Sequence, residues 1–309
     1  MSHTGPPAPR AYARSMAENV PEIPTRLLVH ALVREDGTVD TGELYTVAGA
    51  LGMSDQQVRL CIKRLVAEGR FTHEGRGRKA LLHTTADVTG SLAPEVEYVR
   101  HAYAQDHGQA PWDGVWHLFA FAVPESARAA RDTLRDTLLG LGAAAVQGGL
   151  YVSANPIGAH VEAQARHLGI LDALTTFTSR DLRVGERRDA TELAAGLWPL
   201  EEIAGRYEAL AALARARLGR LDAVTEPAGI EQLTIAVELA AAFTRAMEPD
   251  PLLPPQLLPR PWAGAQARDL AARCWARLLG HQAASATDGH HRLRLFSLYA
   301  DAVEQAGHG

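Results

Sequence analysis

Only two cysteines, Cys61 and Cys274, occur among the 309 residues of the chain. So few cysteines indicate neither a disulfide framework nor a cysteine-based zinc site. The sequence also lacks any run of about 18 apolar residues, and no apolar segment follows the charges near its N-terminus. Because a secreted disulfide scaffold and a helical membrane protein are both disfavoured, we expect a cytoplasmic protein with no membrane partner.

Signatures of common enzymes are missing as well. The chain contains no G-x-S-x-G, no H-E-x-x-H, no P-loop and no glycine-rich dinucleotide fingerprint. Gly140–Gly149 is rich in glycine, but it follows an expected helix rather than a strand, which favours a turn over a nucleotide-binding loop. The histidines at positions 281, 290 and 291 favour a solvated segment over a metal site. We expect no catalytic residue, no metal and no cofactor.

The remaining composition suits a protein of several domains. Hydrophobic residues make up 47% of the chain, enough for two or three domains with cores of their own, and the net charge is −5. Residues 1–22 contain four prolines and few large apolar side chains, so this segment is expected to be disordered. Beyond it, the patterns described below predict an α+β, multidomain fold.

The clearest helix signal lies in Ser54–Lys79, with the sequence SDQQVRLCIKRLVAEGRFTHEGRGRK. Ser54 and Gln57 have the spacing of a capping box, and Asp55 places a negative charge where the helix dipole favours one. Gly69 supplies a C-terminal stop. The apolar residues expected to form the packed side of this helix recur at helical spacing: Val58, Cys61, Ile62, Leu65 and Val66.

A hairpin is predicted directly after this helix. Arg70–His73 and Lys79–Thr84 have the pattern of short strands, separated by a basic, glycine-rich tip. Upstream, Ile23–Val33 and Thr41–Leu51 show the apolar spacing of helices, and Arg34–Asp40 between them is a polar break. Three helices followed by a hairpin predict a winged helix-turn-helix domain, which we bound at residues 23–88.

Positive charge is concentrated in the same stretch. From Ser54 to His83 there are seven Lys or Arg against three Asp or Glu, in a chain that is negative overall. The predicted DNA contacts fall into three groups: Gln56, Gln57, Arg59, Leu60 and Lys63 on base edges, Arg64 nearer the phosphates, and Arg76, Arg78 and Lys79 on phosphate or the minor groove. An ordinary amphipathic surface helix followed by a hairpin is the alternative interpretation.

The pattern changes after residue 88. Residues 89–111 are mostly polar and are predicted to form a linker helix. Residues 112–186 begin with the apolar strand pattern VWHLFAFAV and then alternate helix and strand signals in the order of a ferredoxin-like domain. Residues 187–309 are predicted to form a helical C-terminal domain, with helices in Thr191–Ala214, Gly229–Met247 and Trp262–Gly280.

Several motifs carry a resemblance to a known family. They are SDQQVRLCIKRLVAEGRF with its GRGRK tip, WDGVWHLFAF from Trp112, and LWPLEEIAGRY with DPLLPPQLLPRPWAG in the last third of the chain. In order and spacing they resemble the PaaX family, the repressors of phenylacetic acid catabolism and their relatives. The family's usual Trp-Asp-Leu is Trp198-Pro199-Leu200 here.

This resemblance implies a fold and a function. The implied domains are a winged-helix DNA-binding domain, a ferredoxin-like middle domain similar to the small CRISPR adaptation nuclease, and a helical C-terminal domain. The implied function is that of a homodimeric transcriptional repressor. It is expected to bind a double-stranded DNA operator arranged as an inverted repeat and to leave it when a small aromatic or acyl-CoA-like effector binds. In the best-known members this effector is phenylacetyl-CoA.

The effector site is predicted where the middle and C-terminal domains meet. The residues expected to line it are aromatic, with arginines available for a carboxylate or phosphate: Trp112, Trp116, Trp198, Tyr207 and Trp262, with Arg206 and Arg260. Simple packing between domains explains these tryptophans equally well. Two other functions stay open, namely a winged-helix scaffold without an effector and a metal-dependent nuclease. The nuclease is disfavoured because the first strand of the middle domain ends in Ala122, Val123 and Pro124, without an aspartate.

Overall fold

The computed structural model describes residues 23–85, 93–223, 229–285 and 293–294, and the chain divides into two compact units. Unit 1 comprises residues 1–90, 217–244 and 275–297, and unit 2 comprises residues 91–216, 245–274 and 298–309. The predicted α+β class is confirmed, because helices occur together with two antiparallel sheets. The segment predicted to be disordered, residues 1–22, and the histidines at 290 and 291 lie outside the described residues.

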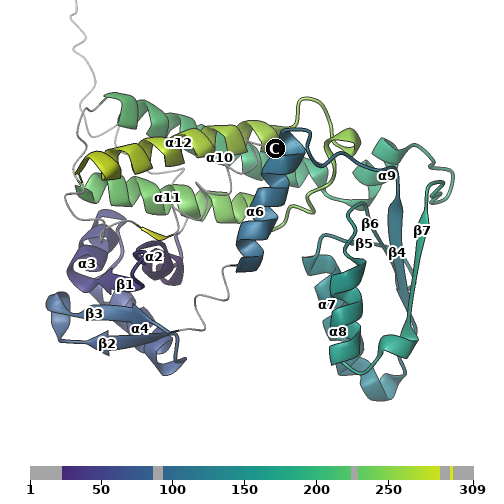
Figure 1. The fold of residues 1–309 in the computed structure, drawn as a ribbon, viewed down its shortest axis with the longest axis horizontal. Helices are drawn as coiled ribbons and strands as arrows, with labels where there is room; N and C mark the ends of the chain where they lie inside the picture. Colours follow the sequence, from purple (N-terminus) through teal and green to yellow (C-terminus); the bar gives the residue numbers. More distant parts are fainter. Residues whose placement is uncertain (1–22, 86–92, 224–228, 286–292, 295–309) are drawn as a thin grey trace, which may run out of the picture. The chain divides into compact units, whose positions relative to one another are not determined.

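Unit 1 begins with three helices and a small sheet (Figure 1). The helices are α2 (Thr25–Ala31), α3 (Thr41–Ala50) and α4 (Asp55–Ala67), and the strands are β1 (Thr38–Asp40), β2 (Phe71–Glu74) and β3 (Leu81–Thr84), with the 3₁₀ turn η2 (Gly77–Lys79) between β2 and β3. The sheet is antiparallel in the order β1-β3-β2. The helices and hairpin follow the predicted ranges closely, whereas β1 lies in a segment predicted to be a polar break.

The start of α4 confirms the predicted capping box. The Ser54 hydroxyl accepts a hydrogen bond from the backbone N–H of Gln57 (3.3 Å), and Gln57 Oε1 accepts one from the backbone N–H of Ser54 (2.8 Å). Val58 and Ile62 are buried as expected, but Val66 is 37% exposed. The prediction for Val66 was wrong because this residue projects about 80° around the axis from Val58, at the margin of the buried stripe.

Unit 2 contains the helix α6 (Ala93–Asp106) and a four-stranded sheet with two helices. The order along the chain is β4 (Trp116–Phe121), η3 (Glu125–Ala127), α7 (Arg128–Gly140), β5 (Ala144–Gln147), β6 (Leu150–Ser153), α8 (Gly158–His167), η4 (Leu171–Ala173) and β7 (Leu174–Ser179). The sheet is antiparallel throughout, in the order β5-β6-β4-β7. Its first strand is the apolar run predicted after Trp112.

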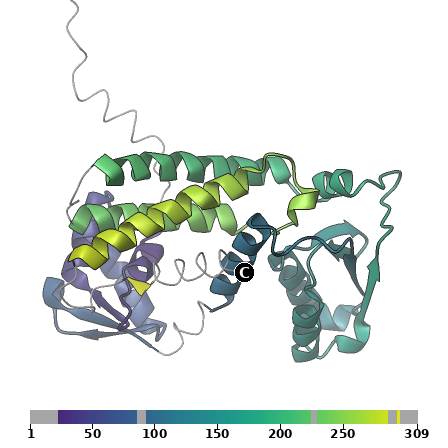
Figure 2. The ribbon, with the colours of Figure 1, turned by 45° about the horizontal axis from the view of Figure 1, so that its top comes forward.

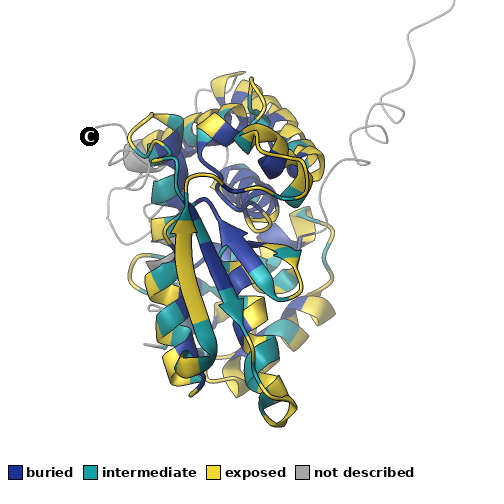
Figure 3. Cartoon of the chain, turned by 90° about the vertical axis from the view of Figure 1, so that its right-hand side faces the viewer, coloured by how far each residue is buried: buried dark blue, intermediate teal, exposed yellow. Residues whose placement is uncertain are grey.

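Alternation along β4 gives the sheet two packed faces. On one face α7 and α8 lie side by side (Figures 1 and 2), and Phe119 packs there with Leu134 and Leu138. Trp116 and Leu118 point to the opposite face and belong to a second hydrophobic cluster. The edge strand β7 is mostly exposed (Figure 3). The core of this part of unit 2 therefore lies above and below the central strands.

Helices dominate the rest of the described chain. They are α9 (Ala190–Leu197), α10 (Leu200–Ala223), α11 (Gly229–Met247) and α12 (Ala263–Ser285), with the 3₁₀ turn η5 (Pro255–Leu257) between α11 and α12. The single helix predicted over Thr191–Ala214 is wrong, since the chain breaks between α9 and α10. Trp198 is extended there, because the residue before a proline is driven out of the helical region. No described helix is long and apolar enough to cross a membrane.

Candidate functional site

The residues predicted to contact DNA from α4 all lie on its outer side. Six side chains are exposed: Gln56, Gln57, Arg59, Leu60, Lys63 and Arg64. Leu60 is 49% exposed, which is high for a large apolar side chain. Within the described part of the chain, no carboxylate forms an ion pair with Arg59, Lys63 or Arg64. This face of α4 therefore presents amides, an apolar side chain and uncompensated positive charge together.

The tip of the β2–β3 hairpin folds back onto α3 and α4. The Thr41 hydroxyl lies within hydrogen-bond distance of the carbonyl oxygens of Gly77 (2.9 Å) and Ala80 (2.7 Å). Arg78 Nη2 donates to Asp55 Oδ2 at the start of α4 (3.2 Å), and the Arg78 guanidinium lies 5.4 Å from the centre of the Tyr45 ring. The hairpin tip and the first turn of α4 are thus joined by polar contacts.

The three basic residues of the tip consequently differ. Arg76, Arg78 and Lys79 are all exposed, but Arg78 has a carboxylate partner in Asp55. No ion pair forms at Arg76 or Lys79 among the described residues. Arg76 and Lys79 are therefore free to neutralise phosphates, whereas Arg78 would first have to leave Asp55 or share it.

The predicted effector residues separate into two groups within unit 2. Trp112, Trp116 and Trp198 are neighbours. The ring centres of Trp112 and Trp116 are 5.1 Å apart, and those of Trp116 and Trp198 are 6.3 Å apart. Trp116 and Trp198 are buried in the cluster on one face of the sheet, and the Trp198 Nε1–H donates to the Gly142 carbonyl oxygen (3.0 Å). These two rings pack the core in the way that the alternative interpretation describes.

The second group is Tyr207 and Trp262, whose rings meet edge to face with centres 6.2 Å apart. The two arginines predicted for the effector site, Arg206 and Arg260, lie on the surface of unit 2. Arg206 Nη2 pairs with Glu202 on the same helix (2.7 Å), and Arg260 is exposed. The structure does not bring either arginine into the lining of the cavity that Trp262 borders.

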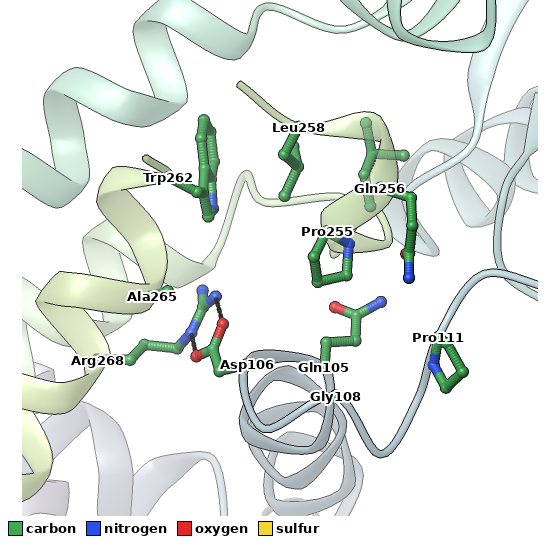
Figure 4. A pocket seen from close by; sticks show the side chains of 11 residues that line it. Gln105, Asp106, Gly108, Pro111, Pro255, Gln256, Leu258, Trp262, Ala265 and Arg268 are labelled. Carbon is green, nitrogen blue, oxygen red and sulfur yellow. Dashed lines mark hydrogen bonds and ion pairs between the residues drawn. The ribbon is translucent and has the colours of Figure 1, made fainter. Parts of the chain in front are cut away.

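This cavity in unit 2 has a volume of about 250 Å³ and an apolar majority in its walls (Figure 4). The end of α6 contributes Gln105 and Asp106, and the start of α12 contributes Ala265 and Arg268 beside Trp262. The remaining walls come from the segment after α6 and from the connector between α11 and α12: Gly108, Pro111, Leu253, Pro255, Gln256 and Leu258.

A buried polar network stands at one end of the cavity. Arg268 is almost fully buried and donates from Nε and Nη2 to the two carboxylate oxygens of Asp106, at 2.6 and 2.7 Å. Its Nη1 donates to the Tyr207 hydroxyl (2.8 Å) and lies 3.5 Å from Asp250 Oδ2. The Tyr207 hydroxyl donates to the Asp250 carboxylate. The Arg268 guanidinium therefore forms ion pairs with two carboxylates, Asp106 and Asp250.

Burial is the largest single influence on the pKa of Tyr207, Asp250 and Arg268. It raises the pKa of the Asp250 carboxyl, an effect that Arg268 opposes, and it raises the pKa of the Tyr207 hydroxyl. Burial alone would lower the pKa of Arg268, but the hydrogen bonds to Asp106 and the charges of Tyr207, Asp106 and Asp250 together raise it. Arg268 therefore stays charged beside its two carboxylate partners, Asp106 and Asp250.

The sequence prediction missed Gln105, Asp106 and Arg268. Arg268 lies on the buried stripe of α12, three residues before Ala271 and seven before Trp275. An arginine on an otherwise apolar helical stripe is a signal that the sequence does contain, because a buried cation needs a carboxylate partner. The identity of that partner, 162 residues away, could not be derived from local patterns.

Comparison with known proteins identifies the family. Residues 109–193 match the family model described as PaaX protein central Cas2-like domain, and residues 198–287 match the PaaX-like protein C-terminal domain. The chain belongs to the PaaX family. The transcriptional repressor PaaX of Escherichia coli (strain K12) is 26% identical over 252 residues, which cover 80% of this chain and 77% of that protein.

A solved structure is similar as well. An uncharacterized protein from Mycobacterium tuberculosis shares 20% identity with a TM-score of 0.46, covering 87% of this chain and 98% of its own. The two PaaX matches begin after residue 108, so the DNA-contact residues predicted on α4 and the hairpin lie outside both. In the described ranges, no group of three or more His, Cys, Asp or Glu side chains could hold a metal ion.

Proposed function

We propose that this PaaX-family protein is a transcriptional repressor that binds double-stranded DNA through α4 and the β2–β3 hairpin. The observation that carries the proposal is the outer face of α4, where Arg59, Lys63 and Arg64 are exposed and lack carboxylate partners in the described chain. Glutamine and arginine on such a helix can read base edges in the major groove. The named repressor among the similar proteins supports the same assignment.

The proposed domains follow from this assignment. Residues 23–88 act as a winged helix-turn-helix, supported by the order of α2, α3, α4 and a three-stranded sheet. Residues 112–186 act as a ferredoxin-like domain, supported by the strand order β5-β6-β4-β7 with α7 and α8 on one face. Residues 89–111 connect the two, and residues 187–309 form the helical C-terminal domain.

Repression is proposed to be reversible. A homodimer would present two copies of α4 to an inverted repeat in the cytoplasm, because two-fold protein symmetry matches two-fold operator symmetry. A small aromatic or acyl-CoA-like effector would release it by binding the DNA-free conformation more tightly. The cavity beside Trp262 is the best-supported place for part of that effector, since Trp116 and Trp198 are committed to the core.

Selection of duplexes from a random-sequence pool tests the DNA-binding proposal. The full-length protein should enrich a sequence with two-fold symmetry. Selected pools that show no sequence preference after several rounds would contradict the repressor function and favour the alternative of a winged-helix scaffold without an effector. The enriched duplex, incubated with the protein and Mg²⁺ or Mn²⁺, should stay intact, whereas cleavage would support the nuclease.

A further inference from the structure

The cavity beside Trp262 is small. Its volume of about 250 Å³ is below the roughly 300 Å³ at which sites for drug-sized ligands begin, so it suits one ring with a short substituent. One wall is the connector after α11, where Leu252 has a positive φ of 50°. The Leu252 carbonyl oxygen accepts hydrogen bonds from Gln105 Nε2 (2.8 Å) and Asn155 Nδ2 (2.9 Å), which join this wall to α6 and to the segment after β6.

The charge balance of the cavity disfavours an anion. Arg268 is the one cationic side chain among the described lining residues, and its Nε and Nη2 are bonded to Asp106. Its remaining nitrogen faces Tyr207 and Asp250. Releasing Arg268 to a ligand carboxylate would leave Asp106 buried without a partner, at a high cost in free energy. A buried anion in this cavity would therefore have no free cation to neutralise it.

The polar groups on the α6 side of the cavity offer acceptors, whereas Gln256 on the opposite connector accepts from the Trp112 backbone N–H through Oε1 and keeps Nε2 as a donor. Gln105 uses its Nε2 on the Leu252 carbonyl, which leaves Oε1 as an acceptor, and each Asp106 oxygen retains a lone pair after its bond to Arg268. Figure 4 shows Gln105 and Asp106 projecting from the end of α6 toward the space that Trp262 borders from the start of α12. The apolar walls and the indole suit a flat ring, and the acceptors suit an N–H or O–H on that ring.

We propose that this cavity binds an uncharged aromatic ring that carries a hydroxyl or amino hydrogen-bond donor, with the ring against Trp262 and the donor on Asp106 or Gln105. Any charged part of the ligand stays outside. The inference deepens the effector response proposed above and rests on it only for the consequence at the operator, because binding to the cavity is measurable without DNA.

Three matched compounds test the inference on the full-length protein by isothermal calorimetry and thermal shift. 4-Hydroxyphenylacetamide is uncharged and has the donor, phenylacetamide lacks the hydroxyl, and 4-hydroxyphenylacetate has the donor but carries a negative charge. The first should bind and raise the melting temperature in proportion to occupancy. The second should bind at least about tenfold more weakly, because it loses a hydrogen bond to a charged or buried acceptor, and the third more weakly still.

Two variants that fill the cavity locate the binding. Ala265→Met and, independently, Leu258→Trp should each abolish binding of 4-hydroxyphenylacetamide, because both side chains line the cavity. Gln266→Met is the control, since it adds the same side chain at the next, exposed position of α12 and should leave binding unchanged.

Binding that survives both filling variants overturns the site. Carboxylate affinity equal to or above that of the amide, or no binding by any compound at millimolar concentration, overturns the ligand class. Loss of operator selection with normal ligand binding would instead contradict only the proposed function.

Discussion

Asp106 and Arg268 form a two-point ion pair between the end of α6 and the first turns of α12, with N–O distances of 2.6 and 2.7 Å. Both side chains are mostly buried, so the pair replaces hydration with a closely matched carboxylate and guanidinium. The Tyr103 hydroxyl also donates to the Arg268 carbonyl oxygen (3.0 Å), which places a second bond between the same two helices. The cavity owes its polar end to this pair.

Removing one partner should destabilise the protein strongly. Asp106→Ala leaves Arg268 buried without its main counterion, and we expect a loss of about 3 to 5 kcal/mol in the free energy of unfolding. The double variant Asp106→Leu with Arg268→Met removes both charges and should recover most of that loss. Urea unfolding monitored by tryptophan fluorescence measures both values. A loss under about 1 kcal/mol in the single variant would mean that the pair is dispensable.

His30 should make unit 1 less stable in mild acid. Burial, followed by the charges of Arg26 and Arg70, lowers the pKa of His30 below 6.5, and Glu68 only partly opposes this shift. Since the folded state binds the proton less readily than the unfolded state, stability is full above pH 6.5 and is lost as the pH falls toward the folded pKa. Unfolding midpoints between pH 7.5 and 5 should therefore fall more steeply in the wild type than in His30→Gln. Equal slopes would contradict this role.

Thr41 should hold the hairpin tip against α3. Thr41→Val keeps the shape of the side chain but removes the hydroxyl that reaches the Gly77 and Ala80 carbonyl oxygens. We expect a loss of about 1 kcal/mol in stability and faster hydrogen exchange of the backbone amides of residues 77–80. Thr46→Val is the matched control, because the Thr46 hydroxyl bonds only to the preceding turn of its own helix. The same exchange rates in both variants would show that the tip is held by other contacts.

The basic residues of the tip should contribute unequally to the salt dependence of DNA binding. Arg76→Ala and Lys79→Ala should each reduce the slope of log affinity against log salt by about 0.9, since each removes one phosphate contact. Arg78→Ala should change the slope less, because Arg78 is already paired with Asp55. Affinities for random duplex DNA at four salt concentrations measure these slopes. Wild-type slopes in all three variants would rule out the hairpin as a contact.

Local signals in the sequence predicted α4 and the hairpin well. The capping residues Ser54 and Gln57, the buried spacing of Val58 and Ile62, and Gly69 with its positive φ all act within a few residues of one another. Strand β1 could not be predicted in this way. It is three residues long, and its pairing with β3 joins Thr38 to His83, so the stabilising hydrogen bonds come from a distant part of the sequence.

The candidate sites also differ in how far local sequence determines them. The exposed face of α4 followed from helical projection, because exposure on an amphipathic helix depends on spacing alone. The predicted effector residues were chosen as scarce aromatics, yet scarcity does not distinguish a core ring such as Trp116 from a cavity wall such as Trp262. That distinction depends on which side chains from other segments cover each ring.

DNA recognition by the exposed face of α4 is tested most directly by the affinity of α4 variants for the duplex that the wild-type protein selects. Arg59→Ala and Lys63→Ala should each weaken binding to that duplex, with a loss of about 1 to 3 kcal/mol for Arg59 if it makes a bidentate base contact, and should weaken random DNA less. Arg135→Ala, an exposed arginine of α7, should leave both affinities unchanged. Wild-type affinity for the selected duplex in both α4 variants would contradict DNA recognition by this face.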